Sequence, residues 1–249
     1  TDMEQNLSKK TRTESDLIGS REVPESALYG VQTLRGIENF RISKFHLNEY
    51  PLFIQALAIT KMGAAVANRE LDLLTEEQTD AILRACKEIL EGKHHEQFPV
   101  DMIQGGAGTT TNMNINEVVA NRALELMGHQ RGEYQYCSPN DHVNRSQSTN
   151  DAYPTAIHIG LYYTHLKLVK HFEVLIEAFR KKGREFAHII KMGRTQLEDA
   201  VPMTLGQTFN GFASILEHEV KNLDFAAQDF LTVNMGATAI GTGITAEPE

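Results

Sequence analysis

Two long stripes of apolar residues at helical spacing run through the second half of the chain. The first stripe has spacings of seven, four, three and four and consists of Leu161, Leu168, Phe172, Leu175 and Phe179. Residues that recur every three or four positions share one face of a helix. We therefore predict a helix that has Pro154 at its first position and runs to about Lys191, roughly 55 Å at 1.5 Å per residue. Gly193 is expected to break it.

The second stripe follows a helix-start signal, in which Thr204 and Gln207 form a capping box. Its apolar residues are Phe209, Phe212, Leu216, Val220, Leu223, Ala227 and Phe230, and Gly236 is expected after its end. Two such helices cannot cover both stripes by themselves, so further helices must come from more chain or from other subunits. No element follows that could cover them, and we expect the chain to be incomplete.

Helical signals also organise the first half. Pro51 can begin a helix through "PLFIQALAITKMGAAVANREL", and Thr75 with Gln78 fits a capping box before "EEQTDAILRACKEILEG". Asn112 or Asn114 could cap a helix over "INEVVANRALELMG". The fold class that follows is mainly α, with an N-terminal helical domain followed by long helices of a central helical bundle.

The predicted domain organisation has three parts. Residues 1–15 form a flexible polar arm, residues 16–150 the N-terminal domain, and residues 151–249 the first part of the bundle domain. Within the N-terminal domain, "REVPESALYGVQTLRG" is rich in turn formers and is interpreted as loop with short strand pieces.

Composition restricts the class of protein. The chain has 249 residues, 41% hydrophobic and 23% charged, which is typical of a globular protein. A net charge of −9 disfavours nucleic acid as a partner but leaves room for a small anion. No apolar run reaches membrane-spanning length, and the N-terminus lacks the apolar core of a signal peptide. Cys86 and Cys137 follow no metal-ligand or redox spacing, so we expect a cytoplasmic protein.

Three polar segments could carry chemistry, the first being "QGGAGTTTNMN" at residues 104–114. Glycines let the backbone approach a ligand, and hydroxyl and N–H groups before a helix suit an anion. The segment is not a P-loop, because no Gly-Lys-Ser/Thr follows at the required spacing. The alternative is a Gly-rich turn in which Thr and Asn act only as caps.

The second segment is "CSPNDHVNRSQSTNDAYPTA", where Ser148, Thr149 and Asn150 would lie beside the positive end of a long helix dipole. Asp151 could be the cap and leave the other three free, or all four could only cap and turn the chain. The third segment is "GRTQLEDAVP" at residues 193–202, which offers neutral donors but is equally a plain helix–helix connection. The histidines lack the spacing of a helical metal pair, so no metal site is expected.

In combination these segments resemble the aspartase/fumarase superfamily. The resemblance runs from about Asp16 onward and rests on ordered motifs: "REVPESALYGVQTLRGIENF", "QFPVDMIQGGAGTTTNMNINEVVANRALELMGHQ", "PNDHVN", "QSTNDAYPT", "GRTQLEDAVPMTLGQTF" and "MGATAIGTGI". Ser148-Thr149-Asn150 and Thr195-Gln196 resemble the aspartase branch, since the hydratases typically have Ser-Ser-Asn and Thr-His there.

The resemblance implies a reaction and a site. L-Aspartate would lose a proton beside one carboxylate and then ammonia, through an aci-acid dianion, to give fumarate without an organic cofactor. Hydrogen bonds to a carboxylate strengthen as charge builds on it. The implied substrate-binding residues are Thr109, Ser148, Thr149, Asn150 and Thr195, with Gln196 beside the leaving group and Arg35 assisting with substrate charge.

The family pattern also implies a homotetramer in which the three loops come from different subunits. Its serine-base loop, followed by Lys and Asn, has no match here, so no catalytic residue is assigned and the base is expected beyond Glu249. Glu198 stands where the family commonly has Gln. Two alternatives remain open: a class II fumarate hydratase or related fumarate-releasing lyase, and a non-catalytic helical module that binds anions.

Overall fold

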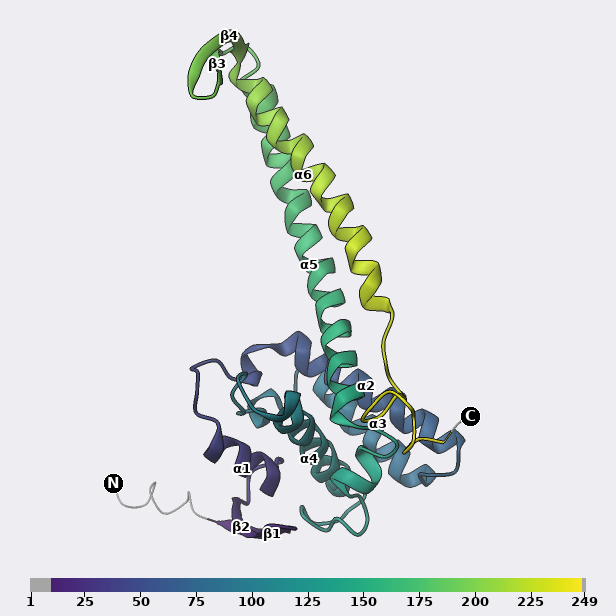
Figure 1. The fold of residues 1–249 in the computed structure, drawn as a ribbon. Helices are drawn as coiled ribbons and strands as arrows, with labels where there is room; N and C mark the ends of the chain where they lie inside the picture. The colour runs from purple at the N-terminus through teal and green to yellow at the C-terminus, as the bar shows by residue number, and fades with distance from the viewer. Residues whose placement is uncertain (1–9, 248–249) are drawn as a thin grey trace, which may run out of the picture. The chain divides into compact units, whose positions relative to one another are not determined.

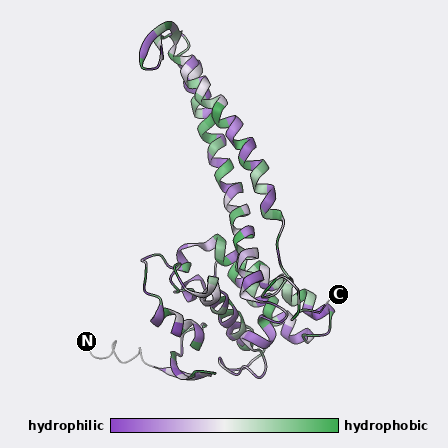
Figure 2. Ribbon diagram, in the orientation of Figure 1, coloured by the Kyte–Doolittle hydropathy of each residue, from purple (hydrophilic) through white to green (hydrophobic). Residues whose placement is uncertain are grey.

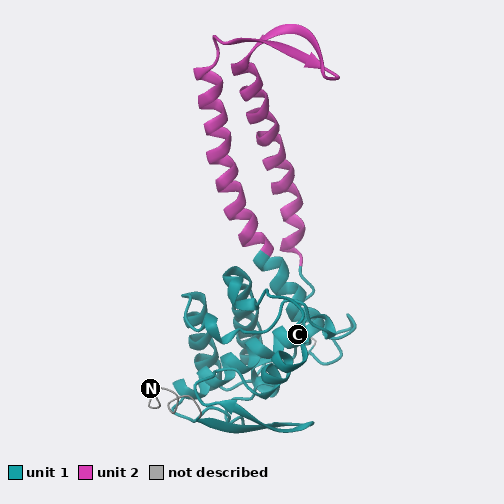
Figure 3. Ribbon diagram, turned by 90° about the vertical axis from the view of Figure 1, so that its left-hand side faces the viewer, with its two compact units in different colours: residues 1–160, 233–249 teal, residues 161–232 magenta. Residues whose placement is uncertain are grey.

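The computed structural model describes residues 10–247 and confirms a mainly α fold with two small sheets (Figure 1). The chain forms two compact units (Figure 3): unit 1 consists of residues 1–160 and 233–249, and unit 2 of residues 161–232. The contacts therefore group residues 151–160 with unit 1, while the predicted domain boundary after residue 150 stays a prediction. Among residues 10–247, none of the helices has the length and apolarity that a membrane crossing requires.

Unit 1 begins with a two-stranded antiparallel sheet, β1 (Thr11–Asp16) and β2 (Gly19–Pro24). The expected flexible arm is therefore wrong for residues 11–15, and its residues 1–9 lie outside the described residues. Arg12 holds this hairpin in place, because its guanidinium donates to the carbonyls of Ala27 and Tyr29 at 2.7 and 2.8 Å. These contacts come from 15 and 17 residues away, which a local pattern cannot show.

Helix α1 (Val31–Asn39) lies where we expected loop. Its first N–H groups are satisfied by carboxylates from distant elements rather than by a neighbouring cap. Glu14 accepts from the N–H of Val31, and Glu117 accepts from the N–H groups of Gln32 and Thr33 at 2.8 and 3.0 Å. A helix N-terminus attracts negative charge, so two buried carboxylates start this helix without a local signal.

Helices α2 (Pro51–Glu70), α3 (Glu76–Leu90) and α4 (Thr109–Leu126) enclose the core of unit 1. Pro51 begins α2 as predicted, and the capping box of Thr75 and Gln78 is present. Short 3-10 turns cover Leu47–Glu49, His95–Gln97 and Gly106–Gly108, and Pro139–Val143 forms a π-helical turn. The predicted caps of α4 are wrong: Asn112 and Asn114 lie inside the helix and are buried.

Helix α5 (Thr149–Glu185) begins five residues before the predicted start and ends before Lys191. Pro154 lies inside it, which normally leaves the carbonyl four residues earlier without a donor. Here that carbonyl belongs to Asn150 and accepts from Nδ2 of Asn234 at 3.1 Å. A contact from the 233–247 segment thus compensates for the missing proline N–H, and the helix continues.

Unit 2 contains the later part of α5, a hairpin and α6. The predicted loop at 193–202 is wrong, because β3 (Ile190–Thr195) and β4 (Glu198–Thr204) pair there. Gln196 and Leu197 form the turn with φ of 49° and 72°, as a two-residue hairpin loop requires. Gly193 lies at a register irregularity in β3 and does not end a helix.

Helix α6 (Leu205–Ala227) starts at the predicted capping box of Thr204 and Gln207 and is followed by a 3-10 turn over Gln228–Leu231. Phe179 of α5 and Phe186, the residue after its end, contact Phe209 of α6, with ring centroids 6.0 and 5.6 Å apart. Figure 2 shows hydrophobic residues along both helices, interspersed with hydrophilic ones. Many of them stay exposed, including Phe225, whose exposed fraction is 82%.

Candidate active site

The Gly-rich segment forms a tight turn before α4. Gly106, Ala107 and Gly108 have φ of 70°, 52° and 96°, a region that glycine adopts most readily. Gln104 closes the turn, because its Oε1 accepts from the N–H of Thr111 at 2.8 Å. A Cβ at residue 108 would lie 2.5 Å from the ring of Tyr153, so this glycine also permits close packing against α5.

Thr109 is the first residue of α4 and is exposed. Its Oγ1 donates to the carbonyl of Gly106 at 2.6 Å. This bond is the turn-capping contact that the alternative interpretation expects of Thr109. The side chain is also exposed, so the hydroxyl remains accessible to a ligand.

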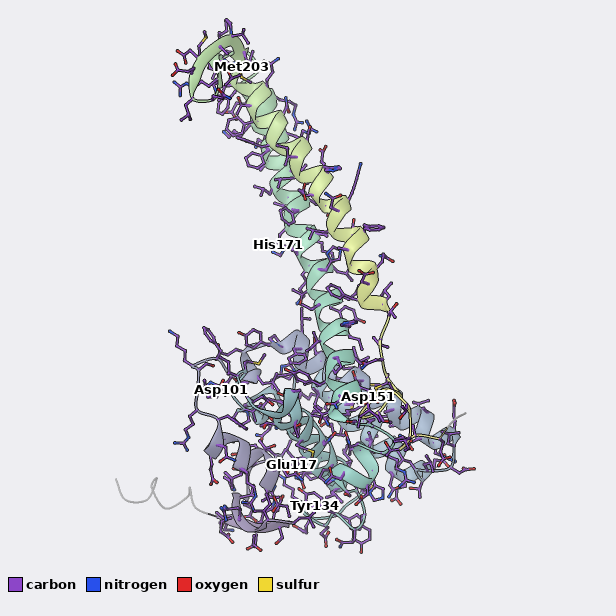
Figure 4. The ribbon with its side chains drawn as sticks, in the orientation of Figure 1. Asp101, Glu117, Tyr134, Asp151, His171 and Met203 are labelled. Atoms are coloured by element: carbon purple, nitrogen blue, oxygen red, sulfur yellow. The ribbon has the colours of Figure 1, made fainter. Side chains whose placement is uncertain are left out.

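At the start of α5, Ser148 and Asp151 do not have the roles of the interpretation in which Asp151 caps the helix and Ser148 is left free. The N–H of Asn150 donates to Oγ of Ser148 at 3.2 Å, and the N–H of Ser148 donates to Oδ1 of Asp151 at 2.9 Å. Ser148 therefore takes part in capping and is not left free. Asp151 is fully buried in the first turn of α5 (Figure 4), and its Oδ2 accepts from the N–H of Thr238 at 2.8 Å.

Asn150 connects the start of α5 to the 233–247 segment. Its Nδ2 donates to the carbonyl of Ala239 at 2.7 Å, and its carbonyl accepts from Asn234. Together with the contact between Thr238 and Asp151, these bonds hold the motif "MGATAIGTGI" against the Ser-Thr-Asn segment. The side-chain amide of Asn150 is thereby oriented from outside its own helix.

The Gly-rich turn and the start of α5 line one cavity of about 500 Å³ within unit 1. Its walls are Met102, Gln104, Ala107, Gly108, Asn150, Tyr153 and Pro154. The resemblance placed all three polar segments in different subunits, but these two meet within one chain. No second subunit is needed to bring these two segments together, and which subunits contribute to the site stays a prediction.

A buried polar network lies behind Thr149 and was not predicted from the sequence. Asn112 in α4 donates from Nδ2 to Oγ1 of Thr149 at 3.2 Å and accepts at Oδ1 from Nζ of Lys61 at 2.8 Å. Lys61 lies on α2 and is fully buried, and burial lowers its pKa to about 7. The one available signal was a lysine inside the apolar run "ALAITKMGAA", which by itself does not indicate a site.

Thr195 and Gln196 belong to the hairpin of unit 2, where both are exposed. Thr195 pairs with Glu198 across the hairpin, and Gln196 occupies the first turn position. Glu198, which departs from the family pattern, is the first residue of β4 and is also exposed. The turn presents two neutral donors at its tip, and their role in a site stays a prediction.

Arg35 is held by an ion pair. Its Nε and a terminal nitrogen donate to the two carboxylate oxygens of Asp16 at 2.8 and 2.9 Å, and these hydrogen bonds lower the pKa of Asp16. The residue lines a separate cavity of about 680 Å³ that shares no wall residue with the cavity beside Asn150. The cavity of Arg35 also borders the Gly-rich segment, at Thr110, but it does not include Asn150. The assistance of Arg35 to substrate binding stays a prediction.

The residues from 10 to 247 contain no group of three or more His, Cys, Asp and Glu side chains that could hold a metal ion. Among the histidines, His165 contacts Asp224 through Nε2 at 2.8 Å. The arrangement in unit 1 therefore offers hydroxyl, amide and backbone N–H groups. Such neutral donors suit a carboxylate whose charge increases during a reaction.

Comparison with known proteins gives a consistent result. A protein-family model described as "Lyase" matches residues 19–249. Aspartate ammonia-lyase of Pseudomonas canavaninivorans is 58% identical over 95% of this chain and 50% of its own length. The aspartate ammonia-lyase of Escherichia coli strain K12 is 55% identical over 98% of this chain and 51% of its own length. The chain thus spans about half the length of these relatives.

Solved structures agree with the sequence relatives. A fumarate lyase:delta crystallin from Brucella melitensis bound to cobalt superposes with a TM-score of 0.91 and 51% identity, over 96% of this chain and 52% of that one. A class II fumarase from Schistosoma mansoni superposes with a TM-score of 0.88 and 36% identity, over 96% of this chain and 50% of that one.

Proposed function

We propose, because this chain belongs to the lyase family whose model it matches over residues 19–249, that the full-length protein is an aspartate ammonia-lyase. It would eliminate ammonia from L-aspartate to give fumarate. Identity of 55–58% to aspartate ammonia-lyases, against 36% to the class II fumarase, supports this substrate over malate. Both cysteines are free and buried, which suits the reducing cytoplasm that we propose as its compartment.

The observation that carries the mechanism is the meeting of the Gly-rich turn and Asn150 of the Ser-Thr-Asn segment at one cavity. In the proposed reaction a base removes a proton from the carbon beside one carboxylate, and the electron pair of that C–H bond spreads onto the carboxylate. The pair then forms the C=C bond as the C–N bond breaks and ammonia leaves. Thr149 and Asn150 would donate to the carboxylate most strongly in the intermediate, which lowers the barrier to proton removal. Thr109 would join them by exchanging its bond to the carbonyl of Gly106 for one to the substrate.

The proposed site is completed by other copies of the chain. Unit 2 carries exposed apolar residues on both α5 and α6, and a helical bundle formed with other subunits would cover them. In the homotetramer that we propose, Thr195 and Gln196 of one subunit would contribute to the site of another. The serine base would come from the part of the protein that corresponds to the other half of its relatives.

Turnover by the full-length protein tests the substrate. We expect fumarate to form from L-aspartate, measured by its ultraviolet absorbance, at a rate well above that from L-malate. Faster turnover of malate would favour the fumarate hydratase. A protein that binds dicarboxylates in calorimetry but turns over neither compound would be the non-catalytic anion-binding module.

The 249-residue chain by itself is expected to be inactive on L-aspartate, because neutral donors stabilise a carbanion only after a base has formed it. The measurement is fumarate production by the purified chain, with the full-length protein as the positive control. Turnover near the typical enzyme value of about 10 per second would show that a base lies within these residues.

A further inference from the structure

The ammonium group of Lys61 is surrounded by neutral acceptors. Nζ donates to Oδ1 of Asn112 at 2.8 Å, to Oδ1 of Asn144 at 3.0 Å and to Oε1 of Gln147 at 2.9 Å. A protonated lysine has three N–H donors and no acceptor, so these three amide oxygens match it fully. The segment from Asn144 to Gln147 therefore wraps around a buried cation that lies on α2.

This cation determines which way the side-chain amide of Asn112 points. Oxygen and nitrogen of an amide are normally assigned from their hydrogen-bond partners. Because an ammonium can only donate, the oxygen of Asn112 faces Lys61 when Lys61 is protonated, and its nitrogen then faces the other way. There Nδ2 donates to Oδ1 of Asn144 at 3.1 Å and to Oγ1 of Thr149 at 3.2 Å.

The direction of the amide in turn determines what the hydroxyl of Thr149 can do. A threonine hydroxyl has one hydrogen and two lone pairs. Asn112 occupies the inner side of this oxygen with an N–H, so the hydroxyl hydrogen cannot be used in that contact. Thr149 is half-buried, and its neighbour Asn150 lines the cavity beside the Gly-rich turn.

We propose that Lys61 and Asn112 are positioning residues that keep Thr149 as an acceptor on its inner side, so that its O–H donates outward to a substrate carboxylate. The inference rests on the proposed function. It assigns a role to Lys61, which no motif indicated, and to Asn112, which the sequence suggested only as a helix cap. Neither residue contacts the substrate, and both act through Thr149.

Holding a charged lysine at this position costs free energy. Burying a charge without a directly bonded counter-charge is unfavourable, and burial lowers the pKa of Lys61 to about 7. The ionisable groups that face it are Cys86 of α3 and Asp151 of α5, which act in the opposite direction. A carboxylate in place of Asn112 would balance the charge, but it would present an acceptor to Thr149.

That contrast supplies the experiment. In the full-length protein, Asn112→Asp keeps an acceptor for Lys61, so the variant is expected to remain folded. The new carboxylate would draw the hydroxyl hydrogen of Thr149 inward and away from the substrate. We expect kcat on L-aspartate to fall by about 100-fold, the lower range for loss of one donor to a developing oxyanion. A kcat within a few-fold of that of the unmodified protein would overturn the proposal.

A double-mutant cycle separates action through Thr149 from general damage. Asn112→Asp should lower kcat strongly in the unmodified protein and hardly at all when Thr149→Ala is already present, because the group it acts on is gone. Multiplicative losses would overturn the proposal. If Asn112→Asp does not fold, Asn112→Ser, which removes the amide, is carried through the same cycle with the same criterion.

Asn68→Asp is the matched control. Asn68 holds the same segment, donating from Nδ2 to the carbonyl of Arg145 at 2.9 Å and accepting from Ser146, and it has no bond to Thr149. A loss in Asn68→Asp as large as that in Asn112→Asp would mean that a loosened segment, not the hydroxyl direction, is responsible. The unmodified protein is assayed separately. If it turned over malate and not aspartate, the proposed substrate would be wrong, and the cycle would be read on malate.

Discussion

The two compact units differ in how they bury apolar side chains. In unit 1, residues from α2, α3 and α4 and from the segments between them form one continuous core, which includes the fully buried Leu57, Ile82 and Phe98. In unit 2, all of whose residues are described, Ala213 and Ala227 are the only buried apolar side chains. Leu168, Val174 and Phe212 remain exposed there.

This difference divides the candidate site into a part that the chain supports by itself and a part that depends on other helices. Thr109 and Asn150 are oriented by contacts inside unit 1, whereas Thr195 and Gln196 lie on a hairpin whose supporting helices have uncovered apolar faces. We infer that contacts within the chain stabilise the first part of the site, whereas the second part is stabilised by contacts with helices of other subunits.

Association of the 249-residue chain is the largest expected effect. Leaving a large apolar side chain exposed costs about 1.5–3 kcal/mol of free energy relative to burying it. This cost accumulates over the exposed side chains of α5 and α6. We expect the chain to self-associate through unit 2 or to aggregate, as measured by light scattering. A monodisperse monomer at tens of micromolar with full helical content would contradict the inference that the apolar faces of unit 2 need other helices to cover them.

Matched phenylalanine truncations compare the units directly. Phe98 in unit 1 is 0% exposed and Phe212 in unit 2 is 46% exposed. Phe98→Ala should lower the free energy of unfolding of the chain by about 3–5 kcal/mol, the usual cost of a large cavity. Phe212→Ala should lower the free energy of unfolding by roughly half as much or less, because a half-exposed side chain gains only about half of the free energy of burial. Urea unfolding measures both, and equal losses would contradict the division.

Within unit 1, Thr149→Ala should affect the reaction more than substrate binding. In the full-length protein we expect the barrier to rise by about 2–4 kcal/mol, as for other oxyanion donors, with little change in KM. Steady-state kinetics on L-aspartate measures this. A raised KM with unchanged kcat would assign Thr149 to ground-state binding alone.

The smallest expected effect concerns an ion pair at the edge of the core of unit 1. Nε of Arg122 donates to Glu88 at 2.6 Å, and this bond lowers the pKa of Glu88 from 4.5 to about 2. A lowered carboxyl pKa stabilises the fold above pH 4.5, and this stabilisation is lost as pH falls toward 2. Glu88→Gln should therefore reduce the free energy of unfolding at pH 7 by less than about 1 kcal/mol. An unchanged difference between the variant and the unmodified chain at pH 7 and at pH 3 would contradict this origin.

The sequence by itself determined those elements whose start signals are local. Pro51 begins α2, and the capping boxes at Thr75 and Thr204 begin α3 and α6, because each bond joins residues within four positions. Ordered motifs likewise predicted the family, which the comparisons confirm. The polar segments of residues 104–114 and 148–151 were recognised for the same reason, since their hydroxyls and glycines stand next to each other in the chain.

Only the tertiary structure decided the features that depend on distant partners. Helix α1 starts on Glu14 and Glu117, and α5 passes through Pro154 because Asn234 supplies a donor from 80 positions further along. The direction of the Thr149 hydroxyl depends on Lys61, which lies 51 residues from Asn112 in sequence and 2.8 Å from it in space. A sequence pattern relates residues that are close along the chain, whereas a buried charge acts on the residues that the fold brings close to it in space.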